Sequence, residues 1–150
     1  MITFLLSTFD NICVIIYLKL GIQKASKGMY RIDLYEDKDG YSDVDEYIQE
    51  LTHSTNKQDI AILKKIRYQL TMLESLGPAL REPPVKELKG YKYKLFELRP
   101  QPERIFFAFW DTDRYVLLSH YTKKQNKTDS KQIDRALKRL EDWLKRKGKL

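Results

Sequence analysis

Alternating apolar and polar residues mark two segments of the chain as strands. Residues 30–34 alternate between apolar and charged side chains, and Leu95–Arg99 alternates in the same way. The run Arg104–Trp110 (RIFFAFW) is almost continuously apolar, which is typical of a central strand covered on both faces. Together with Tyr115–His120, these later segments predict a three-stranded antiparallel meander within residues 89–125. Residues 85–94 are expected to begin this sheet region.

A helical spacing of apolar residues replaces the alternation elsewhere. Asn56 is the predicted N-cap of a helix that Gly77 ends, and a shorter helix capped by Ser42 or Asp43 is expected before it. A last helix is expected after the meander, with Thr128 as its cap. Apolar residues recur every three or four positions in the two longer helices, at Ile60, Leu63, Ile66, Leu70, Leu73 and Leu76, and at Ile133, Ala136, Leu137, Leu140, Trp143 and Leu144.

The order strand, helix, helix, three strands, helix predicts an α+β domain over residues 29–150. We expect a small antiparallel sheet with a mixed edge, on which a helical hairpin and a C-terminal helix pack, all on one face.

Residues 1–28 differ in character from the predicted domain. Their apolar stretch Ile2–Leu20 contains Asp10 and fits neither a membrane-spanning helix nor a signal peptide. We therefore expect the globular domain to begin at Met29, which is a candidate alternative start of translation.

Charge is distributed unevenly along the 150 residues, whose formal net charge is +7. Residues 29–77 carry a net charge of −4, whereas residues 78–127 and 130–150 each carry +5. The basic half is the expected contact for a polyanion. The single cysteine, Cys13, excludes an internal disulfide and favours a reducing cytoplasm. No group of His, Cys or carboxylate residues has metal-ligand spacing, so neither metal nor cofactor is expected.

Several short segments in a fixed order resemble a known family. The segments KELKG, LFELR, RIFFAF and YVLLSHYTKKQNKTD, followed by the helix with Ile133 and Ala136, resemble the HigB branch of the RelE/ParE toxin superfamily. This resemblance spans about residues 29–145 and implies a RelE-like fold and ribosome-dependent cleavage of messenger RNA, which arrests growth. It also implies neutralisation by a HigA-like helix-turn-helix antitoxin, in a heterotetramer that binds operator DNA through the antitoxin.

A metal-independent endoribonuclease needs an acid, a base and cations that stabilise the pentacovalent phosphorane. We predict Arg99 and Arg104 as the phosphate clamps, because a guanidinium binds phosphate oxygens bidentately. Lys123 and Lys124 would position the RNA backbone or transfer protons, and Tyr121 would stack on a base or share proton transfer. Further RNA and ribosome contacts are expected from Lys86, Lys89, Lys92, Lys94, His120 and Lys127.

Each assignment has a structural alternative. Arg99 could only pair with a neighbouring glutamate, the lysine pair could belong to a solvated loop, and His120 could be a structural histidine. Tyr91 and Tyr93 are expected to pack on the sheet. Two other functions also remain open: a ParE-like toxin that inhibits DNA gyrase through protein contacts, and a non-catalytic nucleic-acid-binding module.

Overall fold

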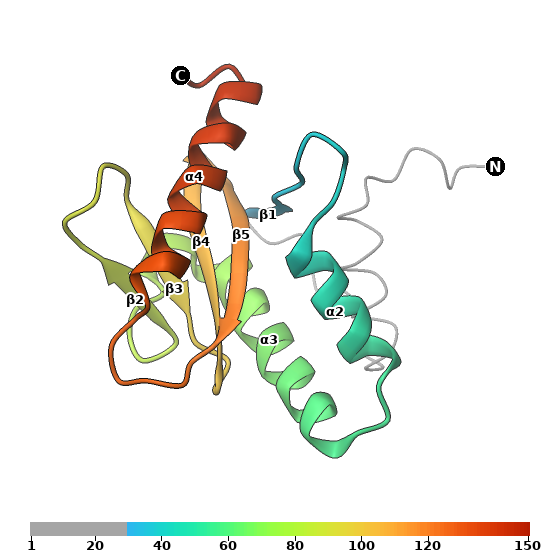
Figure 1. The fold of residues 1–150 in the computed structure, drawn as a ribbon. Coiled ribbons are helices and arrows are strands. Elements are labelled where there is room, and N and C mark those ends of the chain that lie inside the picture. Colours follow the sequence, from blue (N-terminus) through green and yellow to red (C-terminus); the bar gives the residue numbers. More distant parts are fainter. Residues whose placement is uncertain (1–29) are drawn as a thin grey trace.

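The computed structural model describes residues 30–150 and shows one five-stranded sheet with helices on it (Figure 1). The strand order is β1-β5-β4-β3-β2, with β1 parallel to β5 and all other neighbours antiparallel. The predicted α+β class with its mixed edge is therefore confirmed. The predictions for residues 1–28 and for a start at Met29 lie outside the described residues. In chain order the elements are β1 (Arg31–Leu34), α2 (Asp43–His53), α3 (Lys57–Leu76), a 3-10 turn (Gly77–Ala79), β2 (Val85–Leu88), β3 (Leu95–Leu98), β4 (Glu103–Asp111), β5 (Arg114–Thr122) and α4 (Ser130–Arg146).

The helices cover both faces of the sheet, so the prediction that they share one face is wrong. The α2–α3 hairpin shares a core with Ile105 and Phe107 of β4, whereas α4 shares a second core with Phe106 and Ala108 (Figure 1). The physical reason is the apolar run of β4, whose side chains are buried on both faces, because a sheet that is apolar on both sides needs cover on both.

The caps of the hairpin helices agree with the sequence. Ser42 accepts a hydrogen bond from the backbone N–H of Asp45 at 3.2 Å, and Asn56 accepts one from Gln58 at 2.8 Å. The buried stripe of α3 is shorter than predicted: Leu63, Ile66, Leu70 and Leu73 are buried, but Ile60 and Leu76 are 40% and 47% exposed. Both exposed residues lie in the end turns of the helix, and its N-terminal part extends beyond the sheet (Figure 1).

Two boundaries differ from the prediction. The first strand of the basic region, β2, stops at Leu88, and residues 89–94 form the loop that leads to β3, so residues 85–122 form four strands. The N-cap of α4 is Asp129, whose carboxylate accepts from the backbone N–H of Lys131 at 2.9 Å, and Thr128 is free to donate its hydroxyl elsewhere. Within residues 30–150, no helix combines the length and apolar character needed to cross a membrane.

Candidate active site

The carboxylate of Glu97 lies at the centre of a polar cluster built by β3, β4 and β5. Glu97 is completely buried on the α4 side of the sheet. Its Oε1 accepts a hydrogen bond from Nε of Arg99 and pairs with Nε of Arg104, both at 3.3 Å. Its Oε2 accepts from the hydroxyls of Tyr121 at 3.2 Å and Thr128 at 3.4 Å. A buried carboxylate thus joins three of the predicted site residues.

Arg104 is built into the interior of the protein. The residue is only 5% exposed. Its Nη1 donates to the side-chain oxygen of Gln101 at 3.0 Å and to the backbone carbonyl of Glu103 at 2.9 Å, while its Nε faces Glu97. These contacts connect the start of β4 to the preceding turn and to β3.

Arg99 is more accessible and stands on a turn that α3 holds from the other face. Its side chain is 19% exposed. Gln69 of α3 donates to the backbone carbonyl of Arg99 at 3.0 Å, and Lys65 donates to that of Gln101 at 3.1 Å. The hairpin therefore fixes the backbone of the β3–β4 turn, while the arginine side chain lies on the opposite side.

A β-bulge directs Tyr121 to the same face. β4 pairs Phe106 with Ser119 but Phe107 with Leu117, which leaves Leu118 as the extra residue of β5. Because of this shift, Leu117 faces the hairpin while Tyr121 packs against the core under α4, stacked on Phe106 with ring centroids 5.4 Å apart. Burial raises the pKa of Tyr121 to about 12, with a further increase from Glu97 and opposing effects from Thr128 and Arg104. The phenol therefore stays protonated at neutral pH.

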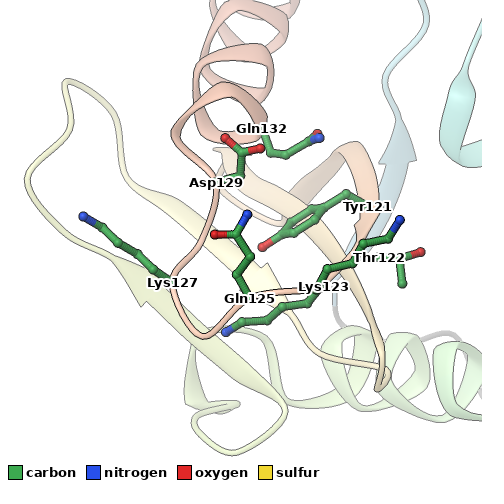
Figure 2. A pocket seen from close by; sticks show the side chains of 8 residues that line it. Tyr121, Thr122, Lys123, Gln125, Lys127, Asp129 and Gln132 are labelled. Carbon is green, nitrogen blue, oxygen red and sulfur yellow. The ribbon is translucent and has the colours of Figure 1, made fainter.

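A pocket of about 340 Å³ opens beside this cluster, between the end of β5 and the start of α4 (Figure 2). The backbone N–H of Lys123 donates to the carbonyl of Pro102 at 3.1 Å, which ties the pocket wall to the β3–β4 turn. The side chain of Lys127 extends away from the other lining residues (Figure 2). Three lysines and Tyr121 are among its lining residues, which are Tyr121, Thr122, Lys123, Lys124, Gln125, Lys127, Asp129 and Gln132.

His120 belongs to a separate cluster on the hairpin face. Its ring stacks on Tyr47 of α2 with centroids 4.1 Å apart, and its Nδ1 lies 3.6 Å from the Oε2 of Glu103. Thr122 donates its hydroxyl to the other oxygen of Glu103. Burial alone would raise the pKa of Glu103, but the adjacent His120 ring, the hydrogen bond from Thr122 and the charge of Arg104 lower it below its usual value. The fold does not bring His120 together with Arg99, Arg104 and Tyr121.

The other predicted RNA contacts lie on β2 and the loop after it. Lys86 stands opposite Glu97 in the β2–β3 register, so its side chain leaves the sheet on the α4 side. Lys89, Lys92 and Lys94 are exposed in the loop, where Lys92 lies 5.2 Å from the ring centre of Tyr93. Tyr93 packs against the core under α4 as predicted, but Tyr91 does not and is 43% exposed.

Comparison with known proteins identifies the family. The family model described as Phage derived protein Gp49-like (DUF891) matches residues 53–141, more than half of the chain. The chain belongs to this family. The match includes the Glu97 cluster, the pocket and the basic loop. No curated protein matches the chain.

The Gp49-like chain is also similar to a solved structure, the crystal structure of the archaeal RelE–RelB complex from Pyrococcus horikoshii OT3. The two chains share 18% identity, and the match covers 65% of this chain and 98% of the archaeal chain, with a TM-score of 0.45.

Sequence reasoning missed the residue at the centre of the Gp49-like site. The sequence indicates Glu97 only as a neighbour that could pair with Arg99, and Thr128 only as a helix cap. The available signal was a glutamate within a strand whose neighbours are apolar, since buried carboxylates are rare unless they are paired. Across residues 30–150, the structure groups no three His, Cys, Asp or Glu residues in a way that could hold a metal ion.

Proposed function

We propose that this Gp49-like protein is the toxin of a toxin–antitoxin pair and acts as an endoribonuclease on translated messenger RNA. The observation that carries the proposal is the convergence of Arg99, Arg104 and Tyr121 on one buried carboxylate, beside a pocket that three lysines line. Cationic groups gathered around a cavity suit a phosphodiester substrate. The resemblance of the strand segments to HigB-type toxins supports the same conclusion.

In the proposed reaction, the 2′-oxygen of one nucleotide attacks the adjacent phosphorus and the bond from phosphorus to the 5′-oxygen breaks. The products are a 2′,3′-cyclic phosphate and a 5′-hydroxyl group. One proton leaves the 2′-hydroxyl and one reaches the departing 5′-oxygen, so no water is consumed in this step. Arg99 and Lys123 stabilise the charge that builds on the phosphorane oxygens.

Tyr121 acts in this proposal as a neutral phenol, because its raised pKa opposes ionisation at neutral pH, and its hydroxyl donates to Glu97, which holds the ring beside the pocket. Lys123 and Lys124 hold the RNA backbone and are the proposed proton-transfer groups. Lys86, Lys127 and the loop lysines extend the positive surface toward the message and the ribosomal RNA. Neutralising phosphates with lysines makes such binding fall steeply with salt.

The proposed partner is a HigA-like antitoxin, and the proposed compartment is the cytoplasm. The acidic residues of α2 offer a docking surface on the hairpin face, away from the pocket. An antitoxin bound there would block entry into the ribosome sterically. The complex is proposed to bind operator DNA through the antitoxin.

The test is induced expression followed by primer extension on a translated message. We expect wild-type protein to cut within codons and these cuts to disappear when translation is blocked. The double substitution Lys123→Ala/Lys124→Ala is expected to abolish the cuts, because both lysines line the pocket. The matched control is Lys145→Ala/Lys147→Ala, which removes the same charge at the other end of α4, where both lysines are exposed (Figure 1).

Arg104→Ala is unsuitable for this test because Arg104 is buried against Glu97. Its removal would destabilise the fold, so a loss of cutting would not report on the pocket. Growth arrest with intact messages would contradict the nuclease and point to an inhibitor such as a gyrase-type toxin. Equal loss of cutting in the control would show that total charge, and not the pocket, governs activity.

A further inference from the structure

Glu97 is a charged group in a place where a charge is costly. Its side chain has no exposure, and a buried carboxylate is tolerated only when hydrogen bonds and opposite charges compensate its lost hydration. Each carboxylate oxygen of Glu97 meets two donors, and these donors come from three strand ends and the loop before α4. The cluster therefore joins segments that the sequence separates by up to thirty-one residues.

The two arginines meet Glu97 in the same way but differ in what their other nitrogens do. Both present Nε to Oε1 at 3.3 Å. Arg104 uses Nη1 on Gln101 and on the Glu103 carbonyl. Among the described residues, Nε of Arg99 makes the one recorded hydrogen bond of that guanidinium, and the side chain keeps solvent access.

We propose that Glu97 is a positioning residue of the nuclease site. Its carboxylate fixes the orientation of Arg99, so that the terminal nitrogens of Arg99 are presented to the phosphate, and Arg104 locks the β3–β4 turn that carries Arg99. Tyr121 is held in register by the second oxygen of the same carboxylate. This inference rests on the proposed function, and it divides the two arginines into one that contacts substrate and one that supports it.

Electrostatics argue for orientation over simple attraction. A negative charge 3.3 Å from two guanidinium nitrogens weakens their pull on a phosphate. If the site needed only positive charge, the carboxylate would lower its affinity without benefit. A fixed donor geometry instead favours the transition state over the bound substrate, because preorganised groups need no rearrangement when charge develops.

The two effects can be separated with Glu97→Gln, which keeps the size of the side chain and removes its charge. The matched control is Glu87→Gln, the same substitution at an exposed position on the neighbouring strand β2. Two quantities are measured on ribosomes programmed with message: the single-turnover rate of cleavage at saturating protein, and the affinity for a message that carries 2′-O-methyl groups and cannot be cleaved. Thermal unfolding of each variant is recorded alongside.

We expect Glu97→Gln to cleave bound message at least tenfold more slowly while its affinity for the uncleavable message stays equal or rises. Glu87→Gln is expected to match wild type in both. A parallel fall of rate, affinity and unfolding temperature in Glu97→Gln would show that Glu97 is only a structural residue, and an unchanged rate would overturn the inference outright.

If Glu97→Gln does not fold, Glu97→Asp is measured instead. This variant keeps the charge but withdraws it from the arginines, so a wild-type cleavage rate would again overturn the inference.

Failure of the proposed function has a different signature. If wild-type protein and Glu87→Gln leave every programmed message intact, the nuclease itself is wrong and the positioning role falls with it. If both cleave and Glu97→Gln cleaves equally well, only the role of Glu97 is lost.

Discussion

Arg99 and Arg104 share one oxygen of Glu97 but are built into the fold to different degrees. Arg104 is buried and also holds Gln101 and the Glu103 carbonyl, whereas Arg99 keeps part of its side chain in solvent. Sequence alone ranks the two as equivalent phosphate clamps, because both flank the same turn. The structure assigns them unequal structural importance, and this inequality can be measured without any substrate.

We expect Arg104→Ala to lower the free energy of unfolding by about 3–5 kcal/mol, because removing one partner of a buried ion pair leaves the other uncompensated. Arg99→Ala is expected to cost on the order of 1–2 kcal/mol, since Arg104 still compensates Glu97 and Arg99 is partly solvated. Urea unfolding of both variants, followed by far-ultraviolet circular dichroism, measures the difference. Equal losses would contradict the distinction between them.

Tyr121 is expected to work as a neutral phenol. Its pKa is raised to about 12, chiefly by burial, so the ionised form is negligible at neutral pH. Tyr121→Phe should therefore lower the cleavage rate by a constant factor between about pH 6 and 9, without removing a limb of the rate–pH profile. The profiles of wild type and variant, recorded side by side, decide this. A limb that is present in wild type and absent in the variant would make Tyr121 the titrating base.

The Glu103 carboxylate should make stability depend on pH. Its pKa is lower in the folded protein than usual, so in the acidic range the unfolded state binds more protons and stability rises with pH. The contribution is present above the unfolded pKa of about 4.3 and is lost as pH falls through the folded value. We expect the difference in unfolding free energy between wild type and Glu103→Gln to be constant at neutral pH and to shrink in acid. A difference that grows in acid would show the opposite sign.

At the scale of elements, local patterns predicted the helices well and the sheet less completely. Ser42, Asn56 and Gly77 mark helix ends because caps and left-handed glycines act over a few residues. The bulge at Leu118 carries no such local signal. Strict alternation from Tyr115 would place Tyr121 on the hairpin face, and only the pairing of β5 with β4 reverses it.

The stripe of α3 gives a matched pair of substitutions. Ile66 is fully buried in the core under the hairpin, whereas Ile60, which the spacing placed in the same stripe, is 40% exposed. Ile66→Ala should cost about 2–5 kcal/mol of unfolding free energy through lost burial and a cavity. Ile60→Ala should cost less than about 1 kcal/mol, as exposed positions do. Chemical denaturation of both measures the contrast, and a cost at Ile60 similar to that at Ile66 would mean that Ile60 is covered in solution.

At the scale of the whole molecule, the site is formed by contacts between segments that are distant in the sequence. The sequence alone therefore predicts the residue types of the site but not their arrangement. Basic residues near the meander could be recognised from charge and order alone. Arg99, Arg104 and Tyr121 meet at Glu97 because of two strand registers, β3–β4 and β4–β5, and Thr128 joins them from the loop before α4. The separation of His120 onto the other face follows from the same registers. Residue types therefore suggested the chemistry, and topology decided which of them act together.

The same topology places the acidic helix α2 and the pocket on opposite faces of the sheet, with the hairpin on one side and α4 on the other (Figure 1). An antitoxin docked on α2 would therefore leave the pocket open. If the proposed function holds, we expect the complex with the antitoxin to bind a short RNA with 2′-O-methyl groups as tightly as the free protein does, yet to fail to bind ribosomes. Fluorescence anisotropy with the labelled RNA and ribosome co-sedimentation measure the two properties separately.

Charge reversal on α2 tests directly whether the antitoxin binds this helix. Glu46 and Glu50 are exposed there, and Glu46→Lys/Glu50→Lys should weaken antitoxin binding at least tenfold, about 1.4 kcal/mol, while message cleavage persists. The control is Glu82→Lys/Glu87→Lys, an equal change of charge at exposed residues before and within β2. An antitoxin that competes with the short RNA and tolerates the α2 reversal would instead lie over Arg99 and Lys123, because only direct cover of the pocket produces both results.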